Sequence, residues 1–99
     1  MVVVVFRSRL VPDLPADYAP MAEGMLALAR TMPGFVSFKA FEAADGERVS
    51  LVGFETAEHA AAWGRHPEHL EAQRHGRERF YAEYHLQIAE VVRERDFER

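Results

Sequence analysis

The chain has no cysteine, which excludes disulfides, a thiolate nucleophile, thiolate-ligated zinc and iron–sulfur clusters. It also lacks a basic excess, because twelve Lys and Arg against sixteen Asp and Glu give a formal net charge of −4. Nucleic acid and anionic membrane surfaces are therefore not expected as partners. The longest apolar run, Val2 to Phe6, is too short for a membrane span or a signal peptide. We expect a cytoplasmic protein.

Glycine-dependent motifs are also missing. The six glycines are scattered between Gly24 and Gly76, so the chain has neither a Walker loop nor a dinucleotide fingerprint, and it has no G-x-S-x-G elbow. Of the 99 residues, 48% are apolar and 11% are aromatic. This composition is sufficient for one packed domain over residues 1–99. A chain of this size buries only about 60 to 65% of its unfolded surface, so a partner is expected to supply further burial.

Periodicity divides the chain into six main elements. Residues 2–11 alternate as a strand that is partly apolar on both faces. Apolar residues at steps of three and four predict a helix from Tyr18 to Met32, with Asp17 as N-cap and Pro33-Gly34 as its end. Residues 35–43 and 48–55 alternate around Ala44-Asp45-Gly46, which is typical of a β-hairpin.

The second half of the chain predicts a divided helix and a long strand. Thr56 is the expected N-cap of a helix that ends at Gly64, and Pro67 begins a third, short helix that ends near Gly76. Leu70 is the main apolar anchor of that short helix. Residues 80–94 then return to strand.

The order β-α-β-β-α-β predicts an α+β, ferredoxin-like domain, with an antiparallel sheet and helices on one face. Apolar residues on the other face require a cover. The last strand, at about 3.3 Å per residue, is roughly 50 Å long, whereas a domain of this size is roughly 30 Å across. We therefore expect a homodimer in which the segment 80–94 reaches the partner subunit. The alternative is a bent strand in a monomer.

The chain has five histidines, and four of them lie within seventeen residues around the single tryptophan, Trp63. His66 and His69 could be neighbouring metal ligands, but no third ligand converges with them, so no metal is expected. His69 and Gln73 on the short helix point either to solvent or into a cavity between helices and sheet. Trp63 is either a core residue or a platform for a ligand.

Several short motifs together resemble the antibiotic biosynthesis monooxygenase family. They are A-x-W at 61–63, H-L-E-A-Q at 69–73, G-R at 76–77, F-Y-A-E-Y at 80–84 and V-V-R at 91–93, with Pro33-Gly34-Phe35 and Phe54-Glu55 earlier in the chain. The resemblance implies a dimeric α/β barrel of two ferredoxin-like subunits, each with an apolar pocket between its helices and its sheet. Characterised members of the family include cofactor-independent oxygenases of anthrones and quinols and haem-degrading enzymes, and other members have no settled substrate.

Individual positions separate these two activities. Trp63 matches the family's pocket tryptophan. Ser8 and Gln73 occupy the positions where haem-degrading members carry an asparagine and a haem-ligating histidine, so haem degradation is not expected. His59 and His69 occupy the positions where anthrone-oxidising members carry a polar residue and a tyrosine.

The sequence therefore predicts a cofactor-independent monooxygenase that combines O₂ with a small electron-rich aromatic of quinol or anthrone type. The resemblance makes His69 and Trp63 the catalytic pair, with His69 accepting the phenolic proton. The expected substrate-binding residues are Phe6, Ser8, His59 and Gln73. The alternatives are a non-catalytic small-ligand module and a haem-binding protein. The sequence does not decide whether His66, His75 and His85 face the pocket.

Overall fold

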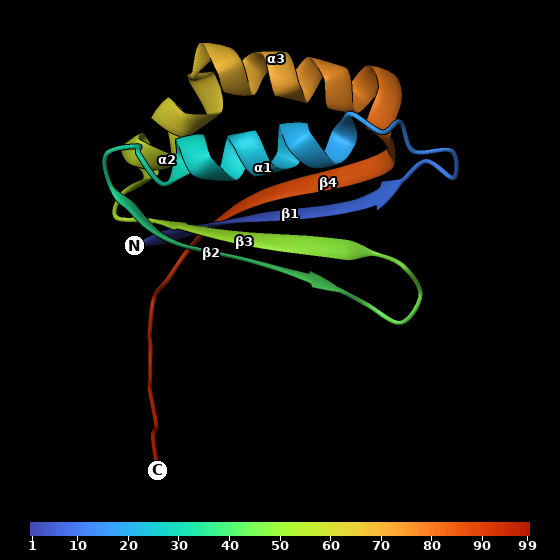
Figure 1. Ribbon diagram of the computed structural model, residues 1–99. Helices are drawn as coiled ribbons and strands as arrows, with labels where there is room; N and C mark the ends of the chain where they lie inside the picture. Colours follow the sequence, from blue (N-terminus) through green and yellow to red (C-terminus); the bar gives the residue numbers. More distant parts are fainter.

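A computed structural model describes residues 1–99 and gives an α+β domain with one sheet (Figure 1). The elements are β1 (Val2–Leu10), α1 (Tyr18–Ala29), β2 (Phe35–Glu42), β3 (Arg48–Phe54), α2 (Ala57–Arg65), α3 (Pro67–His75), the π-helical turn η1 (Gly76–Phe80) and β4 (Tyr81–Glu90). The strands pair antiparallel in the order β2-β3-β1-β4, and the three α-helices cover one face. The predicted ferredoxin-like fold is confirmed.

The core lies between the helices and the two central strands. Val2 and Val4 on β1 stand opposite Phe54 and Val52 on β3, and all four pack toward the helices. Trp63 closes the core from α2 and is 6% exposed. The alternation of β1 therefore places Val2 and Val4 under the helices and the intervening residues on the other face.

The face without helices carries apolar side chains, as the sequence predicted. Val3 and Val5 lie on this face, in register with Gly53 and Leu51 of β3. Leu51 is 36% exposed, and Phe41 on β2 is 47% exposed. A half-solvated antiparallel sheet is normally polar on its outer face, so this surface is suited to burial against a partner.

Strand β4 forms an edge of the sheet and is poorly covered on either side. It pairs only with β1, and residues 82–90 are exposed throughout. Leu86 and Ile88, which lie on the helix side, are 53% and 55% exposed. Only 11 of the 99 residues are buried, so the isolated chain has the burial deficit that its length predicts.

The last strand is shorter than the predicted 80–94. Phe80 belongs to the π-helical turn, and β4 ends at Glu90. Residues 91–99 have no regular structure and run away from the sheet on the side opposite the helices (Figure 1). The prediction was wrong at both ends because alternation alone cannot show where the pairing partner, β1, ends.

The helix ends follow the sequence signals in part. Thr56 caps α2 as predicted, since its Oγ1 accepts from the His59 N–H at 3.1 Å. Asp17 stands at the N-cap of α1 but makes no capping bond, because its carboxylate pairs with Arg79 at 2.7 Å. Helix α2 continues through Gly64 to Arg65. None of the helices combines the length and apolarity that crossing a bilayer requires.

Helix α3 is anchored by a different residue from the one predicted. Leu70 is 48% exposed, whereas Ala72 is buried at 8%. The prediction for Leu70 was wrong because α3 is short and nearly polar, so its largest apolar residue does not define the packed face. The contact with α2 is instead made through the polar side chains of His69 and Gln73.

Candidate functional site

The break between α2 and α3 brings an imidazole onto the indole. His66 precedes Pro67 and has an extended ψ of 130°, which is the conformation that a residue before proline prefers. Helix α3 therefore starts in a new direction, and the ring of His69 stacks on that of Trp63 with centroids 3.9 Å apart and planes 15° apart. The two residues that the resemblance assigned to catalysis are in direct contact.

A hydrogen bond fixes the tautomer of His69. Its Nδ1 lies 2.9 Å from the carbonyl oxygen of Trp63. A carbonyl oxygen only accepts, so Nδ1 carries the proton and the lone pair is on Nε2. No residue of the chain hydrogen-bonds Nε2. Neutral His69 therefore presents a proton acceptor with no partner.

The environment favours this neutral form. Burial lowers the pKa of His69 below its usual 6.5, and a charged His66 would lower it further, while the bond to the Trp63 carbonyl acts in the opposite direction. At neutral pH the ring is therefore uncharged. A neutral imidazole can act as a general base and take up a proton from a weakly acidic group such as a phenol.

Gln73 completes this arrangement. Its Nε2 donates to the carbonyl oxygen of Gly64 at 3.2 Å and lies 3.4 Å from Nδ1 of His69. Both nitrogens are donors, so the second contact is a close approach rather than a hydrogen bond. His69 and Gln73 thus bond to two carbonyls of the last turn of α2, and the Trp63 carbonyl also accepts from the His66 N–H at 3.1 Å. We call Trp63, His69 and Gln73 the indole–imidazole cluster.

Phe6 and Ser8 lie in a second group on the sheet. The Phe6 ring is 5.2 Å from that of Tyr81 and 5.4 Å from that of Tyr84. Ser8 is 6% exposed and stands opposite Tyr84 in the sheet. Tyr18 of α1 joins the group from above, with its ring 6.3 Å from that of Tyr81. This tyrosine cluster shares no hydrogen bond or aromatic contact with the indole–imidazole cluster.

Tyr81 is a half-buried residue with a polar hydroxyl that the sequence did not single out. Burial raises its pKa far above the usual 10, and the neighbouring hydroxyl of Tyr18 adds to the effect. Its hydroxyl therefore stays protonated at any physiological pH. The sequence signal for this packing is Gly76, five residues earlier. The Tyr81 ring lies against its backbone, and a Cβ at Gly76 would be 2.5 Å from the ring.

His59 is engaged at the other end of α2. Its Nδ1 is 2.9 Å from Thr56 Oγ1, and a Cβ at Gly34 would lie 2.3 Å from its ring. Gly34 has a φ of +80°, so the chain turns tightly against the imidazole. These contacts hold the start of β2 against α2, and a role for His59 in binding substrate stays a prediction.

The other histidines have separate surroundings. Nδ1 of His66 accepts from the Glu68 N–H at 3.2 Å, and Nε2 of His75 is 3.2 Å from a carboxylate oxygen of Glu71. His85 lines a small pocket of about 180 Å³ with Arg7, Ser8, Glu47, Glu83 and Tyr84. No three His, Asp or Glu side chains are grouped in a way that could hold a metal ion.

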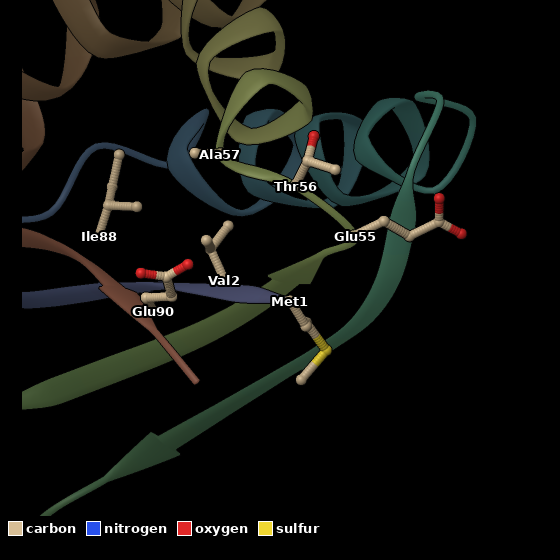
Figure 2. Close-up of a pocket in the computed structure, with 7 residues that line it drawn as sticks. All are labelled: Met1, Val2, Glu55, Thr56, Ala57, Ile88 and Glu90. Carbon is tan, nitrogen blue, oxygen red and sulfur yellow. The ribbon is translucent and has the colours of Figure 1, made fainter. Parts of the chain in front are cut away.

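The larger pocket, of about 350 Å³, lies at the start of α2 (Figure 2). It is lined by Met1, Val2, Glu55, Thr56, Ala57, Ile88 and Glu90, which include none of the predicted site residues. Figure 2 shows the Glu90 carboxylate beside Val2 and the Glu55 carboxylate turned outward. We call this hollow the α2 pocket.

Fold and cluster together define a ferredoxin-like α+β domain with an imidazole stacked on a buried indole. The sequence profile of the antibiotic biosynthesis monooxygenase family matches residues 1–75, and the chain belongs to this family. It is 32% identical over 95 residues to the protein YqjZ of Bacillus subtilis, a match that covers 96% of this chain and 82% of that protein.

Solved structures agree on the fold. Rv0793 from Mycobacterium tuberculosis superposes with a TM-score of 0.83 at 20% identity, covering 96% of this chain and 98% of the other. SnoaB, a cofactor-independent oxygenase from Streptomyces nogalater, superposes with a TM-score of 0.79 at 16% identity, covering 94% of each chain. At these identities the likeness establishes the fold and leaves the reaction to be argued from the site.

Proposed function

We propose that this protein is a cofactor-independent monooxygenase of a small electron-rich aromatic, with quinols and anthrones as the substrate type. Membership of the family and the likeness to SnoaB support an oxygenase. The observation that carries the proposal is the neutral His69, stacked on Trp63 and with no partner at Nε2.

The proposed chemistry needs only a base and a dry, aromatic surrounding. His69 Nε2 takes the phenolic proton, and the resulting anion passes one electron to O₂ without a flavin or a metal. Recombination of the two radicals forms the C–O bond. With an anthrone, one oxygen atom replaces both hydrogens of the ring CH₂, which becomes a carbonyl, and the other oxygen leaves as water. With a quinol, one oxygen atom is inserted into a ring C–H bond, and the other leaves as water with the two hydroxyl hydrogens, so the product is a hydroxyquinone. Trp63 and Phe6 are the proposed ring contacts, and Ser8, Gln73 and His59 the proposed polar ones.

Oxygen uptake on a panel of hydroquinones and anthrones tests this proposal. We expect the purified protein to consume O₂ with at least one of them, and His69→Ala to lower kcat by about 10² to 10⁴-fold, the usual contribution of a positioned base. His66→Ala is the matched control, because His66 lies beside the same indole but its Nδ1 is bonded to the Glu68 N–H. Equal turnover by the His69→Ala variant and the parent would remove His69 from the mechanism.

We also propose that the working form is a homodimer in which the uncovered sheet faces pack together. Support comes from the exposed Leu51 and Phe41 on that face and from β4, whose residues 82–90 are exposed on both sides. Light scattering at micromolar concentration should give twice the mass of 11.3 kDa. A mass equal to one chain would contradict the dimer.

A non-catalytic ligand-binding module is the second candidate. One observation favours it: neither the α2 pocket nor the pocket beside His85 is lined by a residue of the indole–imidazole cluster. A ligand held in either pocket would not contact the proposed base, His69. The two candidates differ in turnover: a binding module saturates with the aromatic compound, seen as quenching of Trp63 fluorescence, without consuming O₂. Protein free of iron and flavin absorbance is required for this comparison.

A further inference from the structure

One arginine differs from every other cation of the chain. Arg48, at the start of β3, is half-buried, and its guanidinium takes part in no ion pair and no side-chain hydrogen bond. The other half-buried arginine, Arg9, is paired with Asp45 and Glu83, and the remaining Lys and Arg residues are exposed. A charge that is partly removed from water is normally paired, so Arg48 is suited to an anion from outside the chain.

The sheet register places Arg48 on the helix side, where the proposed site lies. Arg48 stands opposite Ser8 of β1, and Ser8 stands opposite Tyr84 of β4. Ser8 shares its face of β1 with Val2 and Val4, which pack toward the helices. Residues that stand opposite one another in a sheet share a face, so Arg48, Ser8 and Tyr84 form a row across three strands on the helix side.

The charge of Arg48 acts toward the tyrosine cluster and not toward a carboxylate. Burial raises the pKa of the Tyr81 hydroxyl, and the charge of Arg48 acts in the opposite direction, so the guanidinium lies near this hydroxyl. Glu42 stands opposite Arg48 on β2, but the two side chains make no ion pair. The positive charge is therefore left available on the side of β1 and β4.

Hydroxyl groups without a partner accompany this charge. Ser8 is almost fully buried, and neither its hydroxyl nor that of Tyr84 makes a hydrogen bond within the chain. A neutral hydroxyl can donate to a carboxylate oxygen, and a guanidinium can donate to both oxygens of the same carboxylate. The row therefore combines one cation with two donors that a carboxylate would satisfy.

We propose that Arg48, with the hydroxyls of Ser8 and Tyr84, binds a carboxylate carried by the aromatic substrate. We call these three residues the anion subsite. The inference rests on the proposed function, in which Phe6 and Ser8 contact the compound that His69 deprotonates. It narrows the substrate class from electron-rich aromatics in general to aromatic acids.

The helix side of β4 is open enough to admit such a compound. Tyr84 and Leu86, which follow one another on this side of the strand, are both exposed. The Phe6 ring lies 5.4 Å from that of Tyr84, and Ser8 is the next residue of β1 on the same face. An aromatic ring that lies on Phe6 therefore brings a carboxylate at its edge to the anion subsite.

Two compounds of nearly equal size and shape test the anion subsite without turnover. Anthraquinone-2-carboxylate carries the negative charge, anthraquinone-2-carboxamide is its neutral counterpart, and neither has a phenolic proton for His69 to remove. Binding of each is followed by quenching of the single tryptophan, Trp63. We expect the carboxylate to bind with a Kd about 10- to 100-fold lower than the carboxamide, the usual effect of hydrogen bonds to a charged group.

Variants of Arg48 assign this preference to the guanidinium. Arg48→Gln should bring the two compounds to nearly equal affinity, and Arg48→Lys, which keeps the charge but not the paired donors, should retain part of the preference. Arg30→Gln is the matched control, because Arg30 also has no carboxylate partner but follows the end of α1 that is farthest from Tyr18. It should keep the full preference for the carboxylate.

The outcomes separate this inference from the proposed oxygenase. Equal affinities in the parent protein, binding of neither compound, or a preference that Arg48→Gln retains would overturn the anion subsite, and O₂ uptake with a neutral quinol would then leave the oxygenase standing. A preference that Arg48→Gln removes, without O₂ uptake on any quinol or anthrone, would uphold the anion subsite in a binding module and overturn the oxygenase.

Discussion

Gly76→Ala should destabilise the protein although it replaces a glycine in a helical conformation. Gly76 has φ −57° and ψ −49°, so alanine fits its backbone and would normally stabilise the folded state by about 0.4 to 1 kcal/mol. The added Cβ, however, would lie 2.5 Å from Cε2 and 2.8 Å from Cδ2 of Tyr81. That ring is held by Phe6, Tyr18 and Tyr84 and has little room to retreat.

The expected net effect follows from these opposing contributions. Overpacking of a tight site costs about 1 to 3 kcal/mol, so we expect Gly76→Ala to lower the free energy of unfolding by roughly 1 to 2 kcal/mol. Gly24→Ala in α1 is the matched control, because nothing lies within 4 Å of its added Cβ, and it should raise the free energy of unfolding by about 0.5 to 1 kcal/mol.

Thermal unfolding followed by circular dichroism measures the difference, at one fixed protein concentration because a dimer's Tm depends on it. A change of about 1 kcal/mol moves Tm by about 4 to 8 °C in a domain of this size, so the two variants should move in opposite directions and be easily resolved. If Gly76→Ala is stabilised as much as Gly24→Ala, the π-helical turn does not hold Tyr81 as described.

Three further predictions rest on other contacts of the site. Gly34→Ala should lower the free energy of unfolding by about 1 to 3 kcal/mol, because the new Cβ meets the His59 ring and the backbone has φ +80°. Adding His59→Ala removes the clash but not the backbone strain, so it should recover only part of this loss. Full recovery of the free energy of unfolding, measured with denaturant, would contradict the backbone argument. Activity on a quinol should fall on an acid limb that lies below pH 6.5, since burial lowers the pKa of His69 in the free protein. A limb at or above 6.5 in the pH profile of kcat/KM would refute this. Titration with haem should give no Soret shift of the kind that histidine ligation causes, because Gln73 stands where the family's haem ligand is expected and donates to the Gly64 carbonyl.

The sign of the pH effect on stability follows from the same depressed pKa. The unfolded chain binds the His69 proton at about pH 6.5, whereas the folded chain binds it only at lower pH. The contribution of His69 to stability is therefore complete above pH 6.5 and declines as the pH falls through the lowered pKa.

The fold was predictable because its signals are local. The alternation of 2–11, the proline and glycine after the first helix and the hairpin at Gly46 each fix one element, and the order of elements then leaves few topologies. The ends of the last strand were not predictable, because they depend on where β1 stops and on the π-helical turn at Gly76. Such a turn has no periodic signal of its own.

The site was predictable only as a set of residues. Spacing placed Trp63, His69 and Gln73 on adjacent helices, but the stacking depends on the chain direction set at His66 and Pro67. Tyr81 was overlooked because the ring of Tyr18, which packs near it, lies far away in the sequence, and because the close approach of Gly76 depends on the π-helical turn. Leu70 was assigned to the wrong face because an apolar residue on a short polar helix need not point to the core.

The most direct test of the central claim is the protonation state of His69 itself. Long-range ¹H–¹⁵N correlation spectra of the histidine rings across a pH titration report both the tautomer and the pKa, with His69→Gln identifying the signal. The hydrogen bond to the Trp63 carbonyl predicts a single Nδ1–H tautomer that titrates below pH 6.5. An Nε2–H tautomer, or a pKa at or above 6.5, would contradict the assignment of His69 as the base.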